Sequence, residues 1–369
     1  MRVRAIVVAV GMVAVAGVAG AGPLDLSHLR WYCQHAIATN EAPYSDVTKS
    51  RGLAASPDGR YLYLGHNGLD VWPAVVQARN DRWSETPNQF ASNTLVRLYG
   101  YRGKSIGTDD RGRVYLAEGS GGAYSNSVWW PAGGSPVTNP LAPVRGITIF
   151  SPDLSRQLFA ISRTNCEGVA VKRERGVLAL YATDRNNKTV TRWDLAEDGD
   201  AILGATRTGL GGAGEITNAA ASNLRGLDLD GAGRIWAADV SGNKVWRWNG
   251  DGSGLTNVAV TAAFDVCCMD GRAYVAQQLA GENAGSIRVL DADTMAPIQD
   301  LIRPPAQVTG VTNGTFGCLD VLPGNGGIFV HIETADDARP PRLVLAPRWQ
   351  TPVLHIESVS PTGALIHVE

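Results

Sequence analysis

The chain has 369 residues, of which 44% are hydrophobic and 18% are charged, and its formal net charge is −2. This balance is typical of a folded globular protein and argues against an intrinsically disordered chain. A nearly neutral chain offers no strongly basic surface, so neither nucleic acid nor an anionic membrane is expected as a partner.

The N-terminus has the features of a secretory signal peptide. Arg2 and Arg4 precede an apolar run over residues 5–18, and residues 19–21 (AGA) resemble a cleavage site. We therefore expect removal of residues 1–21 and a secreted or periplasmic mature protein without a membrane span. The alternative is an uncleaved membrane anchor, for which the apolar run is short.

From residue 51 onward, a unit of apolar strand, tight turn and second strand recurs. The first copy, residues 51–64 (RGLAASPDGRYLYL), has a Pro-Asp-Gly turn between its strands, where Pro presets φ and Gly takes a positive φ. The unit at residues 167–195 adds a return strand of alternating polar and apolar residues, and a fourth strand is expected at residues 201–206. Residues 209–223 are expected to form a Gly/Ala-rich connector. The units begin at residues 51, 104, 167, 225, 265 and 317.

Repeats of roughly 40–60 residues with four strands each predict a β-propeller. The expected fold is therefore all-β, a six-bladed β-propeller of four-stranded antiparallel blades spanning residues 22–350. A β-sandwich followed by a second all-β domain is the alternative, but it explains the repeated starts poorly. Residues 31–39 or 352–359 would supply the strand that completes the last blade. Residues 351–369 form a C-terminal strand or hairpin that either closes the ring or begins a further module.

Two stretches carry a resemblance to known repeats. SPDGRYLYLG and NNKTVTRWDL resemble NHL/YVTN-type propeller repeats, and RGLAASPDGRYLYL resembles, more weakly, the senescence-marker-protein/gluconolactonase family of six-bladed propellers. The second resemblance implies a divalent metal on the central axis, held by Glu, Asn and Asp at the starts of the innermost strands. Such a metal would polarise a lactone carbonyl.

The positions that correspond to those ligands differ in this chain. Only Glu167 and Asp265 are carboxylates, and an alternative alignment places Phe264 at the Asp265 position. The other positions are Arg51, Lys104, Arg225 and Gly317. Three cations would repel a divalent metal, so we expect the arginines to pair with the carboxylates and plug the channel. The alternatives are a site for an anionic ligand and a site for calcium or another divalent cation at Glu167 and Asp265.

Other chemistry-bearing residues lie in loops and strands. Trp72, Trp83, Trp129 and Trp130 occur in the insertions of the first two units, where they form either a recognition surface or a cap. The Gly-rich stretch 249–254 resembles the start of a calcium loop but lacks its bidentate Glu, so a hairpin turn is expected.

The mature chain has an odd number of cysteines. Export permits disulfides, and Cys267 and Cys268 could form a vicinal one. Ordinary strand cysteines are the preferred interpretation, because neighbours in a strand point to opposite faces. The five are Cys33, Cys166, Cys267, Cys268 and Cys318.

These observations favour a binding protein. We expect an exported propeller that recognises a ligand or a protein partner through the channel mouth and the insertions of blades one and two, without catalysis and without a cofactor. The alternative is a metal-dependent lactonase or related hydrolase. The sequence has no G-x-S-x-G nucleophile motif and no phosphate-binding loop.

Overall fold

The computed structural model shows an all-β chain. Apart from the 3₁₀ turn η4 (Leu210–Gly212), every regular element in its described part is a strand, and no helix there is long and apolar enough to span a membrane. The signal-peptide region, Trp72 and Trp83 lie outside the described residues. The described residues are 32–35, 50–66, 74–79, 88–89, 96–101, 103–118, 126–140, 145–279, 286–298, 314–321, 328–334, 342–346, 354–360 and 363–368.

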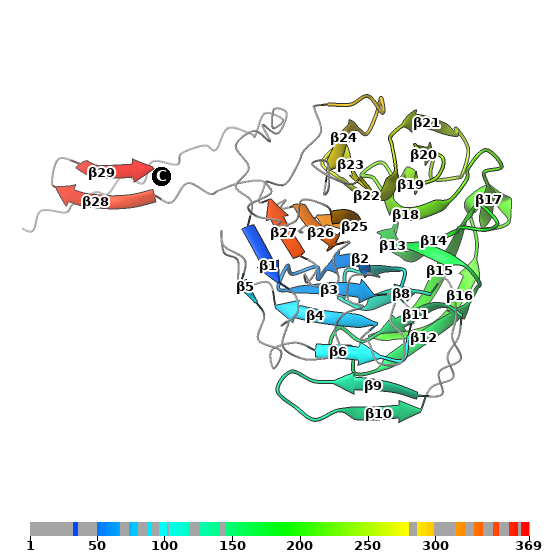
Figure 1. The fold of residues 1–369 in the computed structure, drawn as a ribbon, viewed down its shortest axis with the longest axis horizontal. Helices are drawn as coiled ribbons and strands as arrows, with labels where there is room; N and C mark the ends of the chain where they lie inside the picture. The colour runs from blue at the N-terminus through cyan, green and yellow to red at the C-terminus, as the bar shows by residue number, and fades with distance from the viewer. Residues whose placement is uncertain are drawn as a thin grey trace, which may run out of the picture.

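The strands form sheets that follow the repeats (Figure 1). The first sheet contains β2 (Ser50–Ala55), β3 (Tyr61–His66), β4 (Val75–Arg79), β6 (Val96–Tyr99), β9 (Asn126–Trp130) and β10 (Val137–Pro140). The second contains β7 (Ser105–Thr108), β8 (Val114–Ala117), β11 (Gly146–Phe150) and β12 (Gln157–Ser162). The third contains β13 (Cys166–Glu174), β14 (Val177–Asp184), β15 (Thr189–Asp198), β16 (Ala201–Arg207) and β17 (Glu215–Thr217).

The remaining strands continue this order along the chain. The fourth sheet contains β18 (Leu224–Leu229), β19 (Ile235–Asp239), β20 (Lys244–Trp248) and β21 (Thr256–Ala259). The fifth contains β22 (Ala263–Met269), β23 (Arg272–Gln277) and β24 (Ile287–Asp291). The sixth contains β25 (Gly314–Val321), β26 (Ile328–Thr334), β27 (Arg342–Ala346), β1 (Tyr32–His35) and β5 (Asn88–Gln89). A separate hairpin is formed by β28 (Leu354–Ser360) and β29 (Gly363–Val368).

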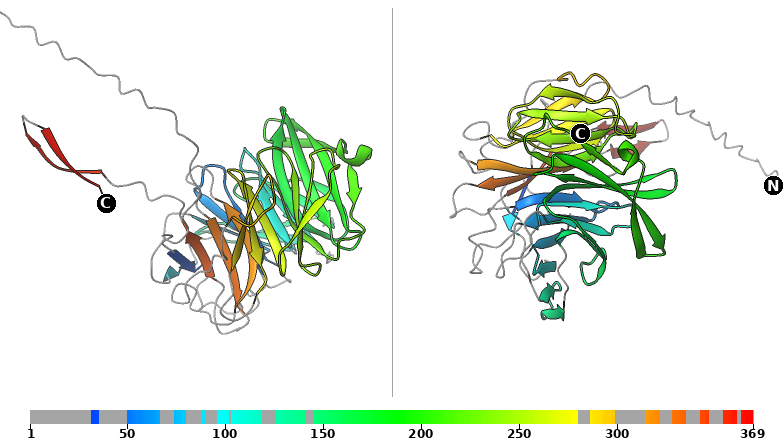
Figure 2. Two further views of the ribbon diagram at one scale, coloured as in Figure 1. Left: turned by 90° about the horizontal axis from the view of Figure 1, so that it is seen from above. Right: turned by 90° about the vertical axis from the view of Figure 1, so that its right-hand side faces the viewer.

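The first strands of successive sheets contact one another around a common centre, which gives a propeller-like arrangement. β2 contacts β7, β7 contacts β13, β13 contacts β18, and β18 contacts β22. β25 contacts both β22 and β2. Figure 2 shows the sheets side by side from two further directions.

Strand number varies between the sheets, although four per unit were predicted. The second and fourth sheets have four strands each. The first sheet has more, because the insertion of the second unit forms the hairpin β9–β10, and β9 pairs with β6 of the first sheet. The predicted connector 209–223 instead contains η4 and β17, and β17 pairs with the start of β15. Both additions cover edges of strands that would otherwise lack hydrogen-bond partners.

An N-terminal strand joins the C-terminal sheet. β1 pairs antiparallel with β27, with Tyr32 opposite Leu345 and Cys33 opposite Val344. Of the two candidate segments 31–39 and 352–359, the first therefore contributes residues 32–35 to the last sheet. From the second, residues 354–359 belong to the hairpin β28–β29, which Figures 1 and 2 show apart from the six sheets.

Apolar clusters fill the space between neighbouring sheets. Between the second and third sheets, Tyr115, Ile147 and Ile149 pack with Leu180 and Trp193, all nearly inaccessible to solvent. Similar clusters lie between the first and second, third and fourth, and fourth and fifth sheets. Burying one such side chain contributes about 1.5–3 kcal/mol, so contacts between sheets are a main source of stability.

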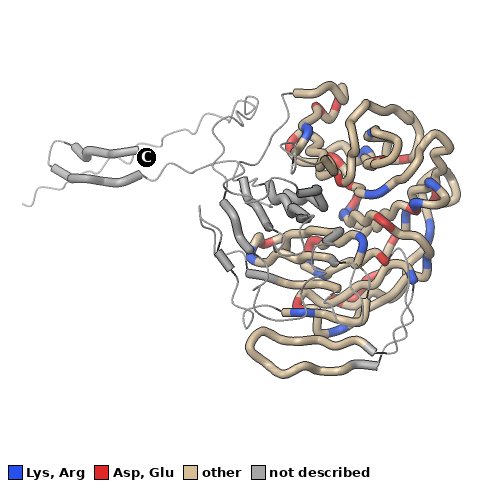
Figure 3. Tube along the Cα trace, in the orientation of Figure 1, with Lys and Arg blue, Asp and Glu red and all other residues tan. Residues whose placement is uncertain are grey.

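Turn aspartates act as structural acceptors in the repeats. Asp109 accepts hydrogen bonds from the backbone of Arg111 and Arg113, from the Arg113 guanidinium (2.6 Å) and from the Tyr115 hydroxyl (2.8 Å). Asp230 binds the equivalent groups of the fourth sheet, including Trp236 Nε1 at 2.9 Å. Acidic and basic residues are interspersed over the described sheets (Figure 3). These carboxylates are therefore part of the scaffold.

Candidate functional site

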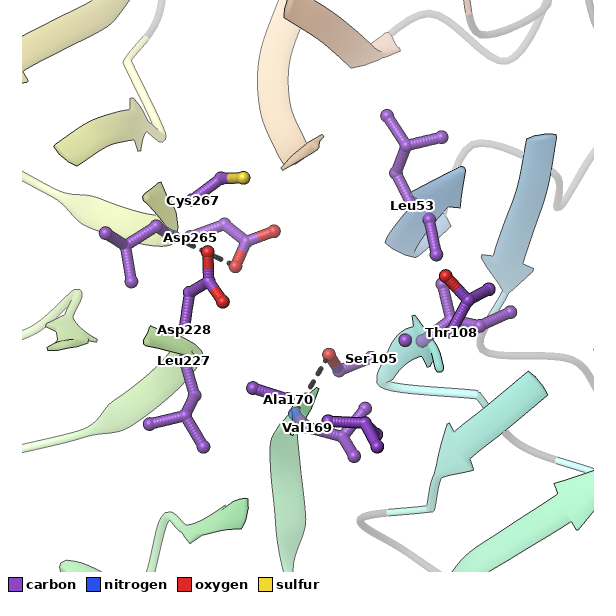
Figure 4. Close-up of a pocket in the computed structure, with 14 residues that line it drawn as sticks. Leu53, Ser105, Thr108, Val169, Ala170, Leu227, Asp228, Asp265 and Cys267 are labelled. Carbon is purple, nitrogen blue, oxygen red and sulfur yellow. Dashed lines mark hydrogen bonds between the residues drawn. The ribbon is translucent and has the colours of Figure 1, made fainter. Parts of the chain in front are cut away.

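A cavity of about 110 Å³ lies where the first strands of the first five sheets meet. This volume has room for several water molecules or a small organic molecule. Its lining comes from β2, β7, β13, β18 and β22 (Figure 4). The lining residues are Leu53, Ala54, Ser105, Ile106, Gly107, Thr108, Val169, Ala170, Val171, Leu227, Asp228, Asp265, Val266 and Cys267.

The lining of the cavity includes two carboxylates and several apolar side chains, and most of its accessible surface is polar. Figure 4 shows the carboxylates of Asp228 and Asp265 near each other, with Cys267 beside them and Leu53 and Thr108 across the cavity. The Thr108 hydroxyl donates a hydrogen bond to the Ala55 carbonyl at 2.6 Å. A concave site with convergent polar groups is a candidate small-molecule site.

Asp228 is held by backbone groups of two neighbouring strands. Its Oδ1 accepts a hydrogen bond from Leu229 N at 2.7 Å in its own strand, and its Oδ2 accepts one from Cys268 N at 2.6 Å in β22. Burial raises the pKa of Asp228 to about 6, because loss of hydration outweighs these N–H groups and the nearby Lys172 charge. The side chain nevertheless borders the cavity, so its carboxyl group remains within reach of a ligand.

Asp265 is positioned by the close approach of the fourth and fifth sheets. Its Oδ1 accepts a hydrogen bond from Val266 N at 3.0 Å. A Cβ at Gly226 would overlap the Asp265 carboxyl group, so only glycine leaves room for this side chain.

Glu167 lies outside the cavity lining and takes part in ion pairs. The carboxylate is 7% exposed and lies 3.7 Å from the guanidinium groups of both Arg185 and Arg225. Arg225 also stacks over the ring of Phe264, with its Cζ 4.9 Å from the ring centroid. Glu167 therefore lies among arginines outside the cavity lining, whereas Asp265 lines the cavity.

The strand register corrects the alignment of Asp265 with Glu167. In the third sheet a β-bulge falls between Cys166 and Gly168, so Glu167 is the bulged residue. In the fifth sheet the bulge falls between Ala263 and Asp265, which makes Phe264 the residue equivalent to Glu167. Asp265 therefore corresponds to Gly168, and the two carboxylates come from different positions of the repeat.

The described residues contain no group of three or more His, Cys, Asp or Glu side chains arranged to hold a metal ion. The stretch 249–254 forms a hairpin turn in which Asp251 accepts hydrogen bonds from the backbone and hydroxyl of Ser253. Lys104 lies just before β7, where its backbone N–H donates to the Ala117 carbonyl at 2.7 Å. Arg51 is part of β2, but its side chain lies outside the described part of the molecule.

The two described insertion tryptophans are at the outer end of the first sheet. Trp129 packs against the cluster between the first and second sheets, and its indole N–H donates to the Asp153 carbonyl at 3.0 Å. Trp130 is 39% exposed, donates to the Gly134 carbonyl, and lies beside the Arg97 guanidinium. They belong to a hairpin that extends the sheet outward.

Cys166, Cys267 and Cys268 are free thiols, so the vicinal disulfide is not formed. Cys267 lines the cavity, whereas Cys268 packs against the cluster between the fourth and fifth sheets. Burial raises the pKa of the Cys166 thiol to about 12 and that of Cys268 well above its usual value. Thiols with raised pKa values are poor nucleophiles at neutral pH.

Asp228 is the site residue that the sequence analysis missed. It lies between Leu227 and Leu229 in a first strand, and an acidic residue between two core leucines was the available signal. Nothing in the sequence distinguished it from Asp230, which follows two residues later and binds the turn.

Comparisons with known proteins do not place the chain in a family. No family model matches it, and no curated protein matches it either. The solved structures that resemble the fold of this chain are β-propeller or WD40-like proteins. The virginiamycin B lyase from Staphylococcus aureus has 12% identity and a TM-score of 0.49, covering 86% of this chain and 99% of its own.

Two further structures show the same level of similarity. A streptogramin B lyase has 10% identity and a TM-score of 0.48, with 85% of this chain and 97% of the other covered. The WD40 repeats of RRP9 have 11% identity and a TM-score of 0.47, with 81% and 94% covered. Likenesses this distant assign neither an activity nor a ligand to the chain.

Proposed function

We propose that this protein is an exported six-bladed β-propeller, built from residues 22–350, that binds a small molecule in its axial cavity. The observation that carries the proposal is the cavity itself. It lies among five first strands and combines the carboxylates of Asp228 and Asp265 with apolar surface from Leu53, Val169 and Leu227. Polar groups placed around a concave site can orient a small ligand.

Support for six blades comes from the contacts between first strands. Each sheet contacts the next, and β25 lies between β22 and β2. The pairing of β1 with β27 joins the N-terminal part of the chain to the last sheet. In a closed propeller this connection would hold the first and last blades together through strand pairing.

The insertion hairpin is less suited to hold a small ligand. β10 lies at the opposite edge of the first sheet from β2, so Trp130 is remote from the cavity. The Trp129 and Trp130 indole N–H groups already bind carbonyl groups of the chain. We therefore place ligand recognition in the cavity and leave to this hairpin, at most, contact with a protein partner.

A cavity-filling variant tests the proposal. Gly107 lines the cavity, and a Cβ there would make only ordinary contacts, the nearest 3.5 Å from the Val169 carbonyl oxygen. Gly107→Leu should keep the fold and abolish binding of compounds found in a thermal-shift screen of small metabolites against the mature chain. Gly204→Leu is the matched control, because Gly204 in β16 has nothing within 4 Å of its Cβ position. Equal binding by both variants would refute the axial site.

A hydrolase is the second candidate, favoured by Asp228. A carboxyl group with a pKa near 6 can donate or accept a proton close to neutral pH, and a second carboxylate lies beside it. Hydrolysis of a panel of lactones that is lost in Asp228→Asn would support this function. A metal-dependent version would require stoichiometric calcium or zinc in the purified protein, measured by elemental analysis.

A further inference from the structure

The C-terminal hairpin β28–β29 places two of the six histidines of the chain directly opposite each other. β28 pairs antiparallel with β29, and the register puts His355 opposite His367. Residues opposite each other in an antiparallel pair share a face of the sheet, with Cβ atoms about 4.5–5.5 Å apart. The two histidines are therefore neighbours on one face of the hairpin.

The other face of this hairpin carries apolar residues. The pairs on either side of the two histidines are Leu354 with Val368 and Ile356 with Ile366. Because successive residues of a strand alternate between the two faces of a sheet, these four residues belong to the face opposite to the histidines. Alternation of this kind is typical of a sheet with one face packed and the other in water. The histidine face is thus the one expected to meet an ion from solution.

Two histidines of the last sheet have different register partners. His35 in β1 is opposite Arg342, whose positive charge would repel a metal ion. His331 in β26 is opposite Cys318, which is a second pair of possible metal ligands. An experiment on the hairpin must therefore separate its histidines from the pair in the last sheet.

We propose that His355 and His367 together bind one divalent ion of a late first-row transition metal, such as Ni²⁺, Cu²⁺ or Zn²⁺, through one nitrogen of each imidazole. Neutral imidazole is a ligand that suits these ions, whereas Ca²⁺ and Mg²⁺ prefer oxygen. Water would occupy the remaining coordination positions. The site is separate from the axial cavity, which is lined by residues of the first five sheets, so the inference goes beyond the proposed function.

Metal binding at this position would stabilise the hairpin. β28 and β29 pair only with each other among the described strands, and Figure 1 shows them apart from the six sheets. A two-stranded hairpin alone is at best marginally stable in water. An ion that bridges the strands favours the paired form, because separated strands do not hold the two imidazoles side by side. The ion would act as a crosslink between the strands.

Titration calorimetry of the untagged mature chain with NiCl₂ at pH 7.5 tests the proposal. His355→Asn and His367→Asn should each weaken Ni²⁺ binding by about 10-fold or more, because two linked ligands bind an ion far more tightly than either alone. Pulsed electron paramagnetic resonance with Cu²⁺ should detect two coordinated imidazoles in the wild-type chain and one in each variant. An excess of CaCl₂ should not displace Ni²⁺.

Matched variants separate the pairing of the histidines from their number. A chain that carries both His355→Ser and Ser358→His has an unchanged composition, but one imidazole moves to a position diagonal to His367, about 7–8 Å away. This exchange should weaken Ni²⁺ binding about as much as His355→Asn. His66→Asn removes an imidazole from β3, where His66 is opposite Ser50, and should leave the affinity unchanged. Deletion of residues 351–369 should abolish binding at this site.

Each result decides for or against the two-histidine site. An unchanged Ni²⁺ affinity in either His355→Asn or His367→Asn would overturn it, as would equal binding by the exchanged chain. Binding that survives deletion of residues 351–369 would place the ion elsewhere, at Cys318 and His331 or at the axial carboxylates, and would also refute the proposal. Loss of Ni²⁺ binding in the hairpin variants, with binding of small molecules in the axial cavity unchanged, is the result expected.

Discussion

Gly168 lies against the backbone carbonyl of Arg225, so that a Cβ on Gly168 would overlap the carbonyl oxygen. The first strands of the third and fourth sheets can approach this closely only because the residue is glycine. A Cβ on Gly226 would overlap the carboxyl group and Cα of Asp265, and a Cβ on Gly52 would lie 2.7 Å from Ile106 N. The Gly that follows Arg51, Glu167 and Arg225 in the repeats thus has a packing role.

Gly168→Ala should therefore destabilise the protein by about 3 kcal/mol, at the upper end of the cost of overpacking, because backbone must move on both strands. Urea unfolding monitored by tryptophan fluorescence measures the change. Gly204→Ala is the control and should be neutral or slightly stabilising, since its Cβ position is open. Equal midpoints for the two variants would show that the strands separate at little cost.

Replacement of Glu167 by Gln should affect stability and leave ligand binding intact. Removing one member of a buried ion pair costs about 3–5 kcal/mol. We expect about 1–2 kcal/mol here, because both pairs are 3.7 Å long and the Arg185 side chain is 45% exposed. Chemical denaturation checks the stability, and titration with a compound found in the thermal-shift screen checks the site. Loss of binding by a folded Glu167→Gln protein would contradict a structural role for Glu167.

Asp228 should make stability depend on pH. Its pKa is about 6 in the folded protein and 3.8 as an ordinary Asp, so between pH 4 and 6 the folded state binds more protons than the unfolded state. Stability should consequently fall as pH rises through this window, by at most about 3 kcal/mol.

Asp228→Asn should remove the fall in stability with rising pH that Asp228 contributes. Urea midpoints measured from pH 4 to 7 would reveal this change. Glu197 acts in the opposite direction at lower pH. Arg173 and Arg113 hold its pKa at about 2, so its contribution is lost as pH falls below about 4.5. The difference in slope between the wild-type protein and Asp228→Asn therefore reports on Asp228, and an unchanged slope in Asp228→Asn would assign the dependence to other groups.

Deletion of residues 22–35 should destabilise the last sheet, because it removes β1 and leaves β27 without that partner. We expect a melting temperature lower by about 5 °C or more, on the basis of roughly 2 kcal/mol or more of lost strand pairing and packing. Deletion of residues 351–369 is the control. β28 and β29 pair only with each other among the described strands, so their loss should change the melting temperature little. Differential scanning calorimetry of both truncated chains decides the comparison.

Local chemistry made most strands and turns predictable. β16 spans Ala201–Arg207, close to the strand expected at residues 201–206, and Gly59 takes the positive φ of 70° that the Pro-Asp-Gly turn requires. Strand alternation and turn preference are properties of neighbouring residues, so a single sequence contains them. The strand β17 was missed because it is short and depends on pairing with the distant β15.

The sequence by itself thus determined the repeat, the turns and the presence of charged residues near the start of five of the six first strands. Only the tertiary structure decided which of these charged residues contact one another. A one-residue bulge aligns Phe264 with Glu167, so that Glu167 joins Arg225 while Asp265 lines the cavity with Asp228. The physical reason is that a shift of one residue turns a side chain to the other face of its strand, and contacts between distant strands set that register.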